Sequence, residues 1–133
     1  MGKHFADKMH AICVVLSSDE DQPIVMSIMT GFTDRDELAV TIDSSCYEDK
    51  GFNCSTAVIV NTADARKMAR RHKVKYAELP VFISECMAEW REIVNPDFKQ
   101  VRACFREITD CLLDEGCRFR LVRTTGNEDL MCL

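Results

Sequence analysis

The sequence has few glycines and prolines and no long apolar run, and each shortage excludes a class of protein. Its 133 residues include only 5 Gly and 3 Pro, which excludes a collagen-like or other fibrous chain. No stretch approaches the roughly 18 consecutive apolar residues of a membrane-spanning helix, so we expect no contact with a membrane. Apolar residues nevertheless make up 47% of the chain, too many for a disordered protein. The sequence therefore predicts a single globular domain over residues 1–133.

The sequence patterns of common enzyme and metal sites are also missing. There is no Cys-x-x-Cys, no Gly-x-Ser-x-Gly, no Gly-rich phosphate loop and no His-Glu-x-x-His. His4, His10 and His72 have no Cys, His or carboxylate at the spacing of a metal site. We therefore expect a non-enzymatic protein without metal or cofactor. An enzyme whose site is assembled from dispersed residues is kept as an alternative.

Eight cysteines stand out in a chain of this length. The N-terminal region has no apolar segment long enough for a signal peptide, so we expect a cytoplasmic protein whose cysteines are reduced thiols. Cys46 and Cys54 lie in a polar segment and are the candidates for reactive thiols. Three others fall within apolar patterns and should pack as small hydrophobic residues: Cys13, Cys86 and Cys104.

Alternation of apolar and polar residues in the first half of the chain predicts four strands. Residues Ile24–Phe32 show it most clearly, and their more apolar set should face the core: Ile24, Met26, Ile28, Thr30 and Phe32. The other three predicted strands are Ala11–Leu16, Leu38–Ile42 and Thr56–Val60.

Residues Ser44–Ser55 have no periodicity and form a long predicted loop. Tyr47 and Phe52 in this loop are candidate anchors for a protein partner, since exposed aromatic residues often contribute most to binding. The alternative is that both side chains fold back onto the core.

After Asn61 the apolar period changes to 3.6, which predicts helices. The first predicted helix begins near Thr62 or Asp64, and its apolar face, which includes His72, should point toward the core. The second follows the apolar stripe from Leu79 to Val94. The third is predicted to have Asn95 as its N-cap and Pro96 at its first position, and to end near Gly116.

Residues Cys117–Arg123 alternate again and predict a fifth strand. Four strands, three helices and one strand are typical of an α+β fold. We expect a mostly antiparallel sheet of about five strands, four N-terminal and one C-terminal, with three helices packed on one face. Three arginines on the last strand are typical of the charges that protect a sheet edge: Arg118, Arg120 and Arg123.

Positive charge is concentrated in one helix of an otherwise acidic protein. The net charge is −5 and the pI is 5.2. Positions 66–75 nevertheless hold six cations and no acid. On a helix, five of them lie away from the apolar face and are candidates for contact with phosphate or an acidic partner: Arg66, Lys67, Arg70, Arg71 and Lys73. The simpler alternative is a solvated helix face whose charges are balanced by nearby acids.

These features lead to two main functional hypotheses. The first is a non-enzymatic protein-binding or regulatory domain, supported by the uneven charge and the candidate loop anchors. The second is a nucleic-acid-binding protein that uses the basic helix Arg66–Lys75. The low pI argues against the second, since nucleic-acid-binding domains usually have a pI above about 9.

Overall fold

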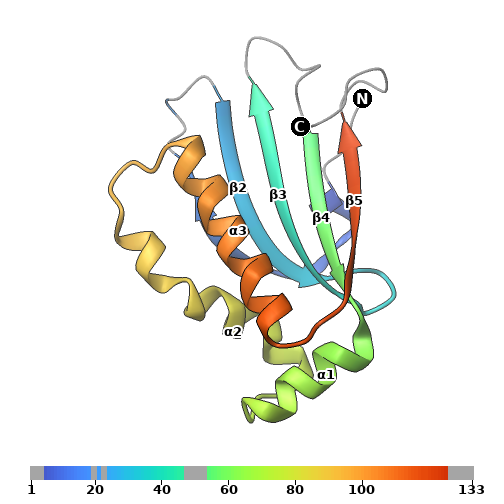
Figure 1. The fold of residues 1–133 in the computed structure, drawn as a ribbon. Helices are drawn as coiled ribbons and strands as arrows, with labels where there is room; N and C mark the ends of the chain where they lie inside the picture. Colours follow the sequence, from blue (N-terminus) through green and yellow to red (C-terminus); the bar gives the residue numbers. More distant parts are fainter. Residues whose placement is uncertain (1–4, 19–20, 22–23, 47–53, 126–133) are drawn as a thin grey trace.

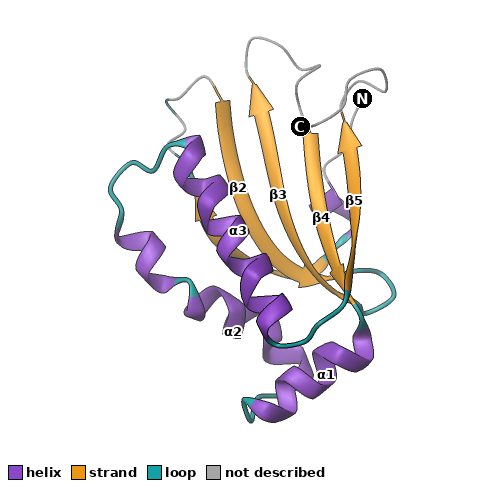
Figure 2. Cartoon of the chain, viewed as in Figure 1, coloured by secondary structure: helices purple, strands orange, loops and turns teal. Residues whose placement is uncertain are grey.

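A single antiparallel sheet forms one layer of the molecule and helices form the other (Figures 1 and 2). The computed structural model describes residues 5–18, 21, 24–46 and 54–125. The strands lie side by side in the order of the chain: β1 (His10–Ser17), β2 (Ile24–Phe32), β3 (Leu38–Cys46), β4 (Cys54–Val60) and β5 (Phe119–Thr125).

Three α-helices connect β4 to β5 within the described residues: α1 (Thr62–Arg71), α2 (Leu79–Cys86) and α3 (Phe98–Asp114). All neighbouring strands pair in antiparallel fashion. The predicted α+β class, with five antiparallel strands and three helices, is therefore confirmed. None of the described helices combines the length and the apolar character that crossing a bilayer requires.

The main core lies between the sheet and the helices. The predicted inward set of β2 is buried from Met26 onward, whereas Ile24 at the start of the strand is 39% exposed. Helices α2 and α3 pack against β1 and β2, and α1 lies below the end of the sheet (Figure 1). The largest fully buried apolar side chains come from both layers: Val15, Ile28, Leu38, Val40, Val58, Val60, Leu79, Val101 and Ile108.

A smaller cluster covers part of the other face of the sheet. Here Met9, Ala39, Ala57 and Ile59 are buried, and Phe5 packs against them from the short 3-10 helix η1 (Phe5–Lys8). The backbone N–H of Phe5 donates to Ser55 Oγ at 3.2 Å, which links η1 to β4. The helices thus leave this face of the sheet to the N-terminal segment.

The predicted second helix is wrong beyond Cys86. After α2 and Met87 the chain forms a separate 3-10 helix, η4 (Ala88–Glu92), and Val94 is 84% exposed. Polar contacts with other elements explain the break. The indole N–H of Trp90 donates to the Glu107 carboxylate at 2.7 Å, and Arg91 donates to the Val15 carbonyl at 3.3 Å. These contacts turn the chain away from the axis of α2.

The predicted start of the third helix is also wrong. Helix α3 begins at Phe98, and Asp97 is its N-cap in place of Asn95. The Asp97 carboxylate accepts the Gln100 backbone N–H at 2.8 Å, and the Gln100 side chain accepts the Asp97 backbone N–H at 2.9 Å. This capping box satisfies N–H groups that lack a helical partner. Asn95 instead has a φ of 51°, which turns the chain before the helix.

The predicted loop Ser44–Ser55 is shorter than expected. Strand β3 continues to Cys46 and β4 begins at Cys54, so that Ser44 pairs with Cys54. Tyr47 and Phe52, the candidate loop anchors, lie outside the described residues and remain predictions. Strand β5 begins at Phe119 rather than Cys117, and it occupies an edge of the sheet as its arginines suggested.

Candidate functional site

The five predicted contact cations lie on or just after α1, whose apolar side is fixed to the core. Ala65, Met68 and Ala69 are buried, and Asn61 caps the helix by accepting the Asp64 backbone N–H at 3.1 Å. This packing turns the opposite side of the helix toward solvent. All five cations are exposed there: Arg66, Lys67, Arg70, Arg71 and Lys73.

Only some of these cations are available to a partner. The guanidinium of Arg66 lies over the ring of Tyr76, 4.5 Å from its centre, and Arg71 is bound to α3. Lys67, Arg70 and Lys73, in contrast, form no ion pair with any residue in the described part of the chain. We call these three residues the α1 basic surface. Within the predicted contact site, these are the three residues whose positive charge is available to a partner.

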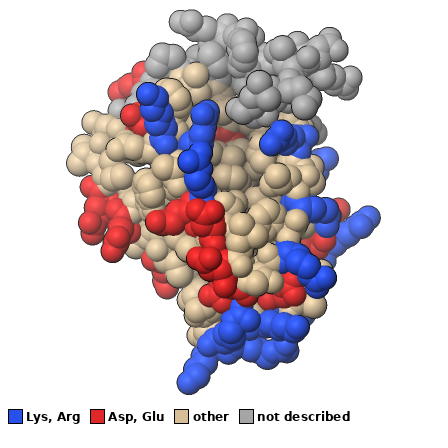
Figure 3. Space-filling view, in the orientation of Figure 1, with Lys and Arg blue, Asp and Glu red and all other residues tan. Residues whose placement is uncertain are grey.

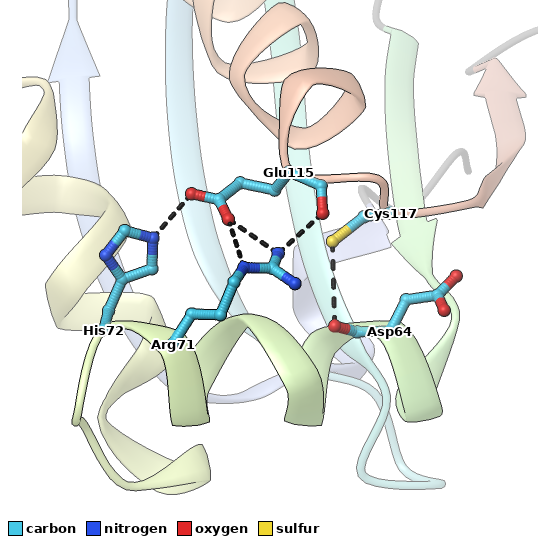
Figure 4. A network of polar contacts seen from close by, with 5 residues as sticks. All are labelled: Asp64, Arg71, His72, Glu115 and Cys117. Atoms are coloured by element: carbon cyan, nitrogen blue, oxygen red, sulfur yellow. Dashed lines mark hydrogen bonds and ion pairs between the residues drawn. The ribbon is translucent and has the colours of Figure 1, made fainter.

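Glu115 at the end of α3 holds the C-terminal end of α1 (Figure 4). Arg71 donates to Glu115 Oε1 from Nε at 3.0 Å and from Nη2 at 2.6 Å, and Nη2 also donates to the Glu115 carbonyl at 2.6 Å. His72 Nε2 lies 2.5 Å from Glu115 Oε2. Burial opposes the ionisation of Glu115, but the hydrogen bonds from His72 and Arg71 outweigh it and lower the pKa of this carboxyl.

The position of His72 differs from the prediction. It was expected on the inward face of the helix, but it is the C-cap of α1 and its side chain is 36% exposed. Its ring packs against Phe82 of α2, with 4.8 Å between the ring centres. His72 therefore lies where α1, α2 and α3 meet, because Glu115 and Phe82 bind it from two sides.

The start of α1 is fixed by a second ion pair. The Asp64 carboxylate accepts the Arg118 Nε–H at 2.9 Å and the Arg118 backbone N–H at 3.0 Å, which lowers the pKa of Asp64. The Cys117 thiol lies 3.8 Å from the Asp64 carbonyl (Figure 4). Farther along β5, Arg120 pairs with Glu37 at 3.1 Å. Two of the three edge arginines thus bind neighbouring loops and helices.

An apolar pocket of about 130 Å³ lies beside the Glu115 network, between the three α-helices. Its walls include Met68 from α1, Ile83 from α2, and Ile108 and Leu112 from α3. The exposed residues His72, Cys86 and Cys111 also line it, together with the half-buried Glu115, and we call these four residues the pocket mouth. The sequence analysis missed this pocket. The signal was the position of Glu115, one turn after Leu112 in line with the apolar stripe of α3.

The cysteines differ in part from the predictions. Cys54 is disulfide-bonded, so the expectation that all eight are free thiols does not hold there. Its Sγ lies 2.9 Å from Ser44 Oγ, whereas the Cys46 side chain is outside the described part. Cys86, predicted for the core, is exposed at the pocket mouth. The described free thiols are Cys13, Cys86, Cys104, Cys111 and Cys117.

Burial makes most of these free thiols weak nucleophiles. It raises the pKa of Cys104 to about 12, and it also raises the pKa values of Cys86, Cys111 and Cys117. Since the thiolate is the reactive form, these four residues are poor candidates for nucleophilic catalysis. Among the residues that the structure describes, no group of three His, Cys, Asp or Glu side chains could hold a metal ion.

Comparison with known proteins adds no assignment. Neither a known protein family, nor a curated protein, nor a solved structure matches this chain. The functional argument therefore starts from the α1 basic surface and the pocket beside it.

Proposed function

We propose that this protein is a non-enzymatic protein-binding domain whose α1 basic surface contacts an acidic surface of its partner. The observation that carries the proposal is the exposure of Lys67, Arg70 and Lys73 without ion pairs to described residues. Packing on the core and ion pairs at both ends fix the backbone of α1. A partner would therefore meet positive charges on a helix that is already ordered, which reduces the entropy lost on binding.

The charges around α1 favour a protein partner over a nucleic acid. Figure 3 shows Asp and Glu side chains gathered across the middle of the face that α3 occupies, between Lys and Arg side chains toward both ends. A long polyanion that extended from α1 over this face would meet repulsion. Helix α2, which follows α1 along the chain, has no Lys or Arg and buries Leu79 and Ile83, so it adds no positive charge for a nucleic acid.

Nucleic-acid binding through Arg66–Lys75 is the second candidate, because this segment has six cations and no acid. The cytoplasmic location and the partner's identity both stay predictions. An enzyme with a dispersed site remains the third alternative, to which the raised thiol pKa values give no support.

The test compares two triple charge reversals. The first is Lys67→Glu/Arg70→Glu/Lys73→Glu on the α1 basic surface. The matched control makes the same charge change on the exposed side of α3: Lys99→Glu, Arg102→Glu and Arg106→Glu. Each variant and the wild type are used to capture partners, and the captured protein is then purified and titrated by calorimetry. We expect the α1 variant to bind at least about tenfold more weakly, or about 1.4 kcal/mol, with the control within about twofold.

The same three proteins are titrated with fluorescent DNA and RNA oligonucleotides at about 50 and 200 mM salt. Salt-sensitive binding that only the α1 variant loses would establish the nucleic-acid alternative instead. A purified partner that binds the wild type and the α1 variant equally would overturn the proposed contact surface. Circular dichroism of both variants shows whether the fold is intact.

A further inference from the structure

We propose that the pocket between α1, α2 and α3 binds an apolar side chain presented by a basic segment of a protein partner. This inference rests on the proposed protein-binding function and adds a second contact site with a charge preference opposite to that of α1. Three observations carry it: the size of the pocket, the acids around its mouth and the helix ends that line it.

The size and lining of the pocket suit one apolar side chain. Its volume is about 130 Å³, and Met68, Ile83, Ile108 and Leu112 contribute apolar walls. A cavity of roughly 150 Å³ with similar walls holds a benzene molecule in a protein interior. One Leu, Met or Phe side chain therefore fits, and the walls offer no set of hydrogen-bonding groups that would favour a polar one.

The charges around the pocket mouth favour a basic segment. Cys86 lies in the negative field of Glu85 and Glu115, and Cys111 lies in that of three further acids: Glu107, Asp110 and Asp114. Arg71 and His72 lie beside the mouth, and Glu115 already binds both side chains. Lys or Arg residues that flank the inserted side chain would thus face carboxylates around the opening.

The C-terminal ends of α2 and α3 add to the same preference, whereas the last turn of α1 already has Arg70 and Arg71. The pocket is lined by the last turns of α1, α2 and α3, and helix C-terminal ends carry partial negative charge. Neither α2 nor α3 has a basic residue in its last turn. Arg71 serves the end of α3 by donating to the Glu115 carbonyl. A cation from the partner, placed beside Cys86, would interact with the carbonyl groups at the end of α2 in the same way.

The first experiment titrates the full chain with synthetic amphipathic peptides. It follows by NMR the methyl groups of Met68 and Met87, which both line the pocket. The probe peptide has Leu at i, i+3, i+4 and i+7 and Lys elsewhere. Two control peptides replace either Lys by Glu or Leu by Ala. We expect the Leu/Lys peptide to shift both methionine signals and to bind at least about tenfold more tightly than either control.

Variants locate the binding site. Cys86→Phe and Cys111→Phe each place an aromatic ring at an exposed position of the mouth where the thiol side chain is small, and we expect both to abolish the methyl shifts. Asp110→Lys and Asp114→Lys should each weaken the peptide by about threefold, as expected for exposed charge pairs. The matched control is Asp34→Lys in the exposed turn between β2 and β3, and it should leave the affinity unchanged.

Three outcomes would overturn the inference: no methyl shift at millimolar Leu/Lys peptide, equal binding of the Glu-containing peptide, or unchanged binding by both Phe variants. Amide spectra of each variant distinguish a closed pocket from an unfolded protein. None of these outcomes depends on the α1 basic surface. The inference can therefore fail while the proposed function survives, and the α1 charge reversals test that function separately.

Discussion

The contact between Arg71 and Glu115 predicts a measurable coupling between the ends of α1 and α3. The perturbation is a double-mutant cycle of Arg71→Met and Glu115→Gln. Arg71→Met keeps most of the apolar stem, and Glu115→Gln keeps the shape of the side chain but removes its charge. Because Arg71 also donates to the Glu115 carbonyl, Arg71→Met should cost more stability than Glu115→Gln. The cycle isolates the energy between the two side chains.

The expected magnitude follows from the geometry and the exposure. Two N–H groups of Arg71 reach one carboxylate oxygen at 3.0 and 2.6 Å, and the side chains are 47% and 25% exposed. Exposed ion pairs contribute about 0–1 kcal/mol, and charge-assisted hydrogen bonds raise the value toward the upper end. We therefore expect a coupling of about 1 kcal/mol at low salt, and about half of that in 0.5 M salt.

The assay is urea unfolding followed by the fluorescence of Trp90, the only tryptophan of the chain. It is repeated at pH 7 and at a series of pH values below 4.5. The pKa of Glu115 is lowered in the folded state from its ordinary value of 4.5. Its contribution to the free energy of unfolding is therefore fully present above pH 4.5 and lost as the pH falls through the lower folded pKa. Glu115→Gln should remove this part of the acid sensitivity.

A coupling below about 0.2 kcal/mol at low salt, or one that does not fall as low pH protonates the Glu115 carboxyl, would refute this argument. Asp114→Asn supplies the control. Asp114 is the neighbouring carboxylate and is exposed, without an ion pair to a described residue. Its replacement should change stability by less than about 0.5 kcal/mol.

Three further predictions concern the helices and the thiols. Leu112 is 2% exposed and Leu113 is 58% exposed. Leu112→Ala should therefore lower the free energy of unfolding by about 2–5 kcal/mol, whereas Leu113→Ala should change it by less than about 0.5 kcal/mol. Similar urea midpoints for the two variants would contradict this. Asp97→Ala should cost about 1 kcal/mol through loss of the α3 cap. Asn95→Gly tolerates the positive φ of this residue and serves to show that the Asn95 side chain makes no such contribution. An unchanged melting curve for Asp97→Ala would reject the assigned cap. Cys104 is buried and its pKa is raised to about 12. It should therefore resist iodoacetamide at pH 8 in the folded protein and react after unfolding, which peptide mass mapping can show. Rapid labelling of Cys104 in the folded protein would be incompatible with its burial.

The strands were predictable because their signal is local. In Ile24–Phe32 the alternation itself identifies the buried face, and the structure confirms it from Met26 onward. The order of the strands was not predictable, since it depends on which edges pair across long stretches of chain. The capping box of Asp97 and Gln100 was visible in the sequence, but the Asn95–Pro96 pair offered a competing start signal two residues earlier.

The candidate site was only partly predictable, for a related reason. The positive face of α1 follows from helical spacing. The contacts of Arg66 with Tyr76 and of Arg71 with Glu115 do not follow from that spacing. The break after Cys86 could not be seen, because the apolar period continues to Val94 while the deciding contacts come from Val15 and Glu107. The pocket arises only when three helix ends meet.

The place of β5 in the sheet has a consequence for synthesis on the ribosome. Strands β1 to β4 are neighbours in sequence, but β4 pairs with a strand that is translated after all three helices, with Val60 opposite Phe119. One side of β4 therefore stays open during translation, when an open edge can recruit a strand from another chain. Pulse-labelled hydrogen exchange during refolding should find the amides between β2 and β3 protected before those between β4 and β5. Simultaneous protection would show that β5 pairs with β4 without waiting for the helices.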